Sequence, residues 1–152
     1  MDETEYRQTY RDVNQRKCVF EKAINARRCT CSQAKRFNLA DREGVACNSD
    51  VANDTCTQLL TLMRQKASFS LQMTNVPGPL PHAKEVKVQI GGMIGIQNML
   101  GQDKQHQDNV EDIYTSISEA VKKFNSLESL PYTEIVKSIV KFQGRQRSTR
   151  KK

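Results

Sequence analysis

The sequence predicts an all-α protein, a single-domain bundle of five to six helices. Apolar residues recur at helical spacing through most of the 152-residue chain. The composition is that of a polar, folded, helix-rich chain: 37% of residues are hydrophobic, 27% are charged, and the mean hydropathy is −0.68. No apolar stretch reaches the length of about 18 residues that a transmembrane helix requires.

Two helices are predicted in the first 47 residues. A helix over residues 3–26 is indicated by one apolar stripe, which consists of Tyr6, Tyr10, Val13, Phe20 and Ile24. The pattern breaks over residues 27–32. A second, shorter helix is then indicated by the spacing of Ala34, Phe37, Ala40, Gly44 and Cys47.

A third helix is predicted to begin near residues 48–50, where Asn, Ser and Asp can each cap a helix N-terminus. It has one continuous apolar face, formed by Ala52, Cys56, Leu59, Leu60, Met63 and Ala67. A proline-rich segment over residues 75–81 cannot continue a helix. It is predicted to connect an N-terminal half (1–74) to a C-terminal half (82–142) of one helical domain (1–142).

Residues 84–91 fit either a strand or a helix by periodicity. A buried helix through residue 100 is favoured, because no other segment is predicted to be a strand that could pair with it. Residues 110–124 then form a strongly amphipathic helix. Pro131, at a first helical position, is predicted to open a last helix that runs through Phe142.

The net charge of +7 is concentrated at one end of the chain. Residues 141–152 contain six basic residues and no acidic one, so the preceding 140 residues are nearly neutral. Residues 143–152 are predicted to be a disordered basic tail, which is either simply solvated or contacts the phosphates of a nucleic acid. The candidate anion-binding residues are Arg145, Arg147, Arg150, Lys151 and Lys152.

Five cysteines, all within the first 56 residues, are the candidate metal ligands: Cys18, Cys29, Cys31, Cys47 and Cys56. A zinc ion or an iron–sulfur cluster needs thiolates from segments that can meet, and this clustering suits that need. Arg27, Arg28, Lys35 and Arg36 flank the central pair and would stabilise thiolates. His82 is a possible alternative ligand.

Two other interpretations of the cysteines stay open. The spacing contains no C-x-x-C pair, on which many zinc and redox motifs rely. Cys47 and Cys56 lie on the apolar stripes of their predicted helices, so they also fit small core residues, and disulfide chemistry is the third interpretation. If four cysteines bind one centre, Cys56 is expected to be the one left over.

Three glycines, Gly91, Gly92 and Gly95, are predicted to form a smooth helix face for close packing of another helix or of a partner protein. They do not match a phosphate-binding loop. Each costs about 1 kcal/mol in a helix relative to alanine, so a packing or binding reason is expected.

No nucleophile–base pair has a recognisable spacing, so whether the chain is an enzyme stays open, with the balance against it. The acidic N-terminus lacks the apolar segment of a secretory signal, and a cytoplasmic location is expected. The leading hypothesis is a cysteine-cluster protein that binds a metal or iron–sulfur centre for a structural, redox-sensing or electron-transfer role. The alternatives are a helical module that docks to nucleic acid or a ribonucleoprotein through the basic tail, and a protein–protein adaptor.

Overall fold

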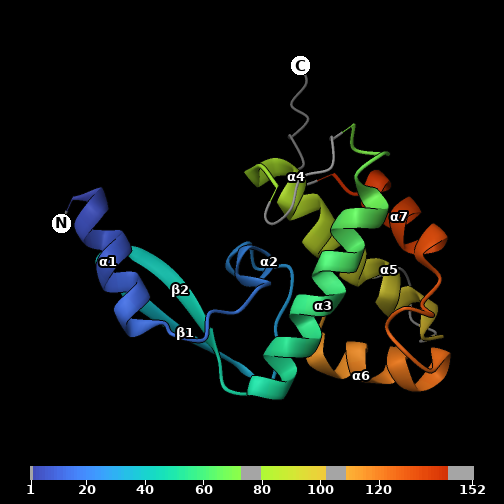
Figure 1. Ribbon diagram of the computed structural model, residues 1–152, viewed down its shortest axis with the longest axis horizontal. Helices are drawn as coiled ribbons and strands as arrows, with labels where there is room; N and C mark the ends of the chain where they lie inside the picture. Colours follow the sequence, from blue (N-terminus) through green and yellow to red (C-terminus); the bar gives the residue numbers. More distant parts are fainter. Residues whose placement is uncertain (1, 73–79, 102–108, 144–152) are drawn as a thin grey trace.

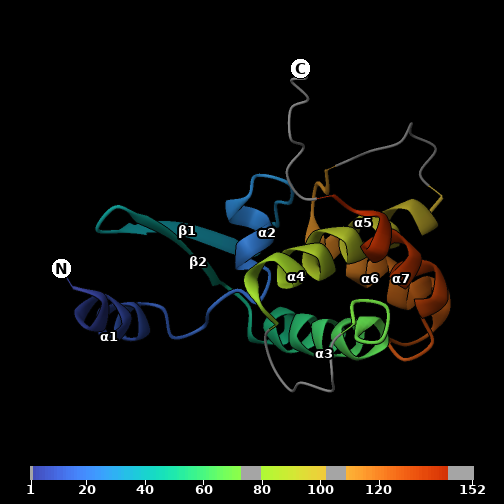
Figure 2. The ribbon, with the colours of Figure 1, turned by 90° about the horizontal axis from the view of Figure 1, so that it is seen from above.

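The computed structural model describes residues 2–72, 80–101 and 109–143, and it combines many helices with a two-stranded sheet. The prediction of an all-α protein is therefore wrong, and the fold is mixed. Figure 1 shows a helical body and an arm, made of the first helix and the sheet, that extends from this body. The view from above shows the same separation (Figure 2).

The sheet is an antiparallel hairpin of β1 (Ala34–Leu39) and β2 (Arg42–Cys47). Ala40 and Asp41 form the two-residue turn between the strands, and Ala40 has a φ of 58°. Such left-handed conformations are usual in tight hairpin turns. The chain therefore reverses direction in the middle of the segment for which the sequence predicts a short helix.

The spacing that suggested this helix also fits a cross-strand pair. Phe37 lies opposite Gly44, and a Cβ on Gly44 would be only 2.2 Å from the Phe37 ring. The glycine therefore makes room for the aromatic side chain on the neighbouring strand. Tyr10 packs edge-on against the same ring, with centroids 5.9 Å apart. These contacts join residues far apart in the sequence, which local periodicity does not report.

The helix predicted over residues 3–26 is interrupted: α1 is Glu3–Val13 and α2 is Glu21–Asn25. Between them the chain runs antiparallel beside β2, and the backbone N–H of Cys18 donates to the carbonyl of Val45 at 3.0 Å. Pairing with the hairpin thus satisfies backbone groups that would otherwise form helical hydrogen bonds.

The helix predicted to begin near residues 48–50 is confirmed as α3 (Asp50–Ala67). The side chain of Ser49 caps it by accepting a hydrogen bond from the N–H of Ala52 at 3.0 Å. All six residues of the predicted apolar face are buried. This helix crosses the helical body in the view of Figure 1, and the view from above shows that it lies along one side of that body (Figure 2).

The two C-terminal helices are also confirmed, as α6 (Ile113–Phe124) and α7 (Tyr132–Lys141). Asp112 caps the first of them by accepting from the N–H of Thr115. Pro131 immediately precedes α7 and is not its first helical residue. Both helices bury the apolar stripe that the sequence indicates.

The segment that fits either a strand or a helix is helical. It runs without a break through α4 (His82–Val86), a π-helical turn η1 (Lys87–Gly91) and α5 (Gly92–Met99). Of the predicted proline-rich connection, residues 75–79 lie outside the described part of the chain. Leu80 and Pro81 lead directly into α4.

The three glycines of this segment are buried against helices of the same chain. A Cβ on Gly91 would lie 2.8 Å from Cα of Ile139 in α7. On Gly92 and Gly95 it would lie 2.5 Å from Sδ of Met63 and 2.9 Å from Cβ of Ser138. The glycines therefore let η1 and α5 approach α7 and α3 at close range.

A buried carboxylate connects four helices. Glu85, which is only 1% exposed, accepts two hydrogen bonds from the guanidinium of Arg64 in α3, at 3.1 and 2.7 Å. It also accepts from the N–H of Leu80 at 3.0 Å and from the side-chain amide of Gln89 at 2.8 Å. The carbonyl oxygen of Gln89 in turn accepts from the N–H of Ala23 in α2 at 3.1 Å. Buried polar groups satisfied in this way specify how helices dock.

We expect Gly91→Ala to lower the free energy of unfolding by about 1–3 kcal/mol, because the added methyl meets the backbone of α7, which cannot move aside. Gly92→Ala is the matched comparison, since its methyl meets the flexible end of Met63. Urea unfolding followed by circular dichroism measures both. Equal losses for the two variants would show that the close approach to α7 is unimportant.

We expect Glu85→Ala to cost about 3–5 kcal/mol, because it leaves the charge of Arg64 buried without its partner. The control is Glu134→Ala, which breaks an exposed pair with Lys137 and should cost less than about 1 kcal/mol. Burial alone would raise the pKa of Glu85, but hydrogen bonds from Arg64, Gln89 and Leu80 outweigh it and lower the pKa below its ordinary value of 4.5.

The lowered pKa of Glu85 determines how the stability of the protein depends on pH. The contribution of Glu85 to stability is complete above the unfolded-state pKa and is lost as the pH falls through the lower folded-state pKa. Unfolding curves of wild type and Glu85→Ala should therefore converge as the medium is acidified below about pH 4.5. A constant gap between them across this range would contradict the role assigned to the carboxylate.

Candidate thiol cluster and basic grooves

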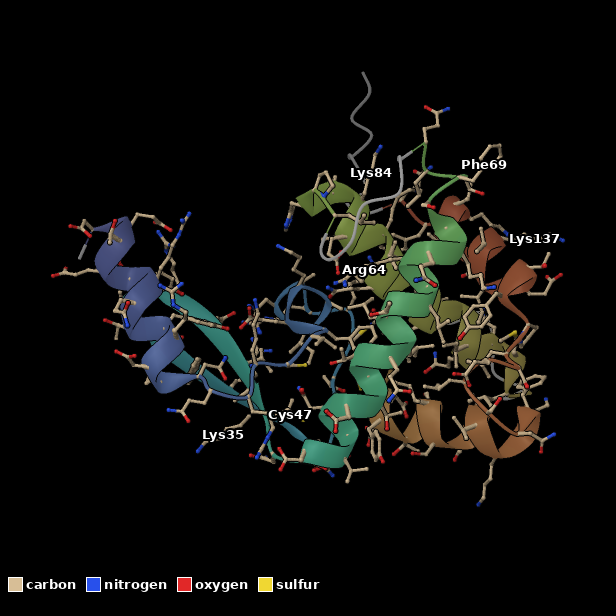
Figure 3. The ribbon with its side chains drawn as sticks, viewed as in Figure 1. Lys35, Cys47, Arg64, Phe69, Lys84 and Lys137 are labelled. Atoms are coloured by element: carbon tan, nitrogen blue, oxygen red, sulfur yellow. The ribbon has the colours of Figure 1, made fainter. Side chains whose placement is uncertain are left out.

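The structure gathers four of the five cysteines around one small cavity. They come from four segments: the extended chain before α2, the loop before β1, the last residue of β2, and α3. These cysteines are Cys18, Cys31, Cys47 and Cys56. Figure 3 shows Cys47 at the base of the hairpin, close to the start of α3. Cys29 is buried nearby and does not line the cavity, so Cys29, and not Cys56, is the one set apart.

The cavity is small and mainly apolar. Its volume of about 10 Å³ is enough for about one water molecule. Besides the cysteines, its walls are formed by Val19, Phe20, Gln33, Ala34, Ala52, Asn53 and Ile113. Four cysteines therefore line one small, mainly apolar space.

Burial raises the pKa of four cysteine thiols. It raises the pKa of Cys18 and of Cys29 to about 12. It also raises the pKa of Cys31 and of Cys56, and the neighbouring cysteines add to the effect because two thiolates would repel each other. Cys18, Cys29 and Cys56 are buried, and buried thiols of this kind are normally unreactive.

The structure does not show a metal site in the part of the chain that it describes. Among the described residues, no group of three or more Cys, His, Asp or Glu side chains is placed to hold a metal ion. The cysteines meet, but as packed thiols, and Cys47 Sγ donates to the carbonyl of Ser49 at 3.3 Å. The possible alternative ligand His82 lies in α4, where its Nδ1 is 3.0 Å from Nζ of Lys22.

A second feature is a pair of grooves on the helical body. One, of about 940 Å³, lies between α5 and α7 and includes Lys137 and Lys141. The other, of about 920 Å³, lies between α2 and α4 and includes Lys22 and Lys87. Arg28 lines both grooves. Figure 3 shows Lys137 on α7, at the edge of the body.

The two grooves meet at Arg28 and Phe142. The guanidinium carbon of Arg28 lies 5.0 Å from the centroid of the Phe142 ring, and its Nε donates to the side chain of Asn109 at 3.2 Å. Nζ of Lys87 donates to the carbonyls of Val140 and Phe142 at the end of α7. The contacts with Phe142 and Asn109 fix the Arg28 guanidinium where the grooves join.

The end of the described chain lies at this junction, because Gln143 lines both grooves. The candidate anion-binding residues Arg145, Arg147, Arg150, Lys151 and Lys152 follow directly in sequence and lie outside the described residues. The basic segment thus continues from a point on the structure that is already basic.

Sequence reasoning missed the grooves. Lys22, Arg28 and Lys87 come from elements far apart in the chain, and each is an ordinary basic residue in its own segment. In the sequence, Arg28 is notable only as a basic neighbour of Cys29. Only the packing of α2, α4 and α7 brings these side chains together.

Comparisons with protein-family models, with curated proteins and with solved structures gave no match. Within the described ranges, no helix is both long and apolar enough to cross a membrane. The function is therefore argued from the thiol cluster and the grooves themselves.

The burial of the cysteines predicts an order of reaction with thiol reagents. Cys31 and Cys47, which are partly exposed, should react first in the folded protein. Cys18, Cys29 and Cys56 should react only as the protein unfolds, because their thiols are buried. Maleimide labelling with peptide mapping measures the order, and protein in denaturant is the control in which all sites react. Labelling of Cys29 as fast as of Cys47 would contradict it.

Proposed function

We propose that this chain is a cytoplasmic nucleic-acid-binding protein that holds the phosphate backbone in its two basic grooves and with its basic tail. The observation that supports this most is that both grooves meet at Arg28 and Gln143, where the tail begins. Five free cysteines are typical of proteins in a reducing compartment and support the proposed location.

The charge of the groove linings suits a polyanion. Lys137, Lys141 and Arg28 face one acidic residue in the first groove, Glu134. That carboxylate is 3.4 Å from Nζ of Lys137 in an exposed pair, which contributes little to stability and is readily exchanged for another anion.

In the second groove, too, basic residues outnumber acidic ones. Lys22, Lys87 and Arg28 line it together with Glu21. The carboxylate of Glu21 is engaged elsewhere, because it accepts a hydrogen bond from the N–H of Val45 at 2.7 Å and another from the hydroxyl of Tyr10. Because three basic residues line the groove with this one carboxylate, the lining carries a net positive charge.

Binding through phosphate contacts depends on the charge and shape of the nucleic acid and only weakly on its base sequence. Lysine and arginine contacts to phosphates position a nucleic acid, whereas sequence is read at base edges. The proposal therefore implies binding that is weakly selective for sequence and strongly dependent on salt, since each contact releases condensed counterions. No catalytic step is assigned.

The adaptor hypothesis used Gly91, Gly92 and Gly95 as a partner-binding face. All three glycines are buried against α7 and α3 of the same chain. Gly91 and Gly95 also line the first groove, so the part of this face that stays open belongs to the groove itself. The basic surface is the better candidate for an interaction.

We expect Lys137→Glu to weaken binding to labelled oligonucleotides, measured by fluorescence anisotropy at several salt concentrations. Removing one phosphate contact should reduce the slope of log affinity against log salt by roughly 0.7–0.9. The control, Lys122→Glu, changes an exposed helical lysine of α6 that lines neither groove, with the same change in net charge. Equal effects of the two variants would indicate that only net charge matters.

The contribution of the tail is tested separately by ending the chain after Phe142. This removes five basic residues. Affinity and salt slope should both fall, while Lys137→Glu should still weaken what binding remains. Full-length protein that binds neither single- nor double-stranded oligonucleotides at low salt would overturn the proposed function.

A further inference from the structure

The thiol cluster has no role in nucleic-acid binding, and its construction points to a chemistry of its own. Two of its cysteines, Cys31 and Cys47, are linked by a short backbone path at the base of the hairpin. The carbonyl of Cys31 accepts from the N–H of Ala34 at 3.1 Å, which closes a turn. Ala34 is in turn the strand partner of Cys47. One turn and one strand pair thus connect the two cysteines.

These two cysteines are also the ones that a reagent can reach. Cys31 and Cys47 are partly exposed, whereas Cys18 and Cys56 lie deeper on the same cavity. Cys31 and Cys47 both line this cavity, whose volume is only about 10 Å³. Both backbones are anchored: the N–H of Cys47 donates to the carbonyl of Arg16 at 2.8 Å.

The loop that carries Cys31 is anchored on its other side as well. The N–H of Thr30 donates to the carbonyl of Val110 at 3.0 Å, and the carboxylate of Asp112 accepts from the N–H of Ser32 at 3.1 Å. Two thiols on anchored backbones beside one another have a high effective concentration for reaction with each other.

We propose that Cys31 and Cys47 form a reversible disulfide by exchange with a low-molecular-weight disulfide such as oxidised glutathione. The thiolate of one of them attacks a sulfur of the small disulfide, forms a mixed disulfide and releases one glutathione thiolate, which takes up a proton. The thiolate of the other then attacks the protein sulfur of the mixed disulfide and releases the second glutathione.

The exchange is balanced. The two cysteines lose two protons and two electrons and gain one S–S bond. The small disulfide loses its S–S bond and is reduced to two thiols. Cys18 and Cys56 remain reduced behind the new bond, because burial holds them as thiols that the reagent does not reach.

The test uses full-length protein, reduced and treated with a chelator, then incubated with oxidised glutathione at mildly alkaline pH. After acid quenching and denaturation, thiol counting should show the loss of two of the five thiols. Non-reducing peptide mapping should join the peptides of Cys31 and Cys47, and a reductant should restore all the thiols. This readout in the wild-type protein does not depend on any variant folding.

Two variants identify the order of the steps. Cys31→Ser and Cys47→Ser should both fail to form the internal disulfide. The variant that keeps the attacking cysteine should stop at a glutathione adduct, and the other should not react. Cys29→Ser is the control, because this cysteine does not line the cavity, and its variant should still form the disulfide.

Three results would overturn the proposal. These are a disulfide that joins a different pair, a glutathione adduct that never resolves in the wild-type protein, and five thiols that remain free after prolonged incubation. The inference is independent of the proposed nucleic-acid binding, which is measured on the reduced protein.

Discussion

The helical body depends on the buried carboxylate of Glu85. A charge in the interior is tolerated only when its hydrogen-bonding capacity is met, and here Arg64, Gln89 and the backbone of Leu80 meet it. Because Gln89 also accepts from Ala23 in α2, the same network sets the distance between α2 and α4. One of the two basic grooves lies between those helices, so the network also shapes the proposed binding surface.

The second constraint is the pairing of an N-terminal segment with β2. The backbone around Cys18 forms hydrogen bonds with the hairpin, so α1 does not continue through this segment. The same pairing brings Cys18 and Cys47 to one cavity. The arm and the thiol cluster are consequences of the same backbone pairing. Four of the cysteines line one mainly apolar cavity, and within the described ranges no group of three or more Cys, His, Asp or Glu side chains is placed to hold a metal ion.

The cysteine site could be predicted only in outline. Confinement of the cysteines to the first 56 residues indicates that they can meet, and four of them do line one cavity. The element that carries Cys47 was not predicted, because the segment expected to be a short helix is a hairpin and Cys47 ends its second strand. The grooves had no sequence signal, since Lys22, Arg28 and Lys137 come from three distant segments.

The sequence by itself determined the helices whose apolar stripes are long and regular. α3, α6 and α7 follow from local periodicity and capping, because both act between residues three or four positions apart. The tertiary structure decided the hairpin, the break after Val13 and the burial of the glycines. In each of these, the determining contact joins residues far apart in the chain, such as Cys18 with Val45 and Gly91 with Ile139. Local propensity is too weak to oppose such contacts, and it does not reveal them.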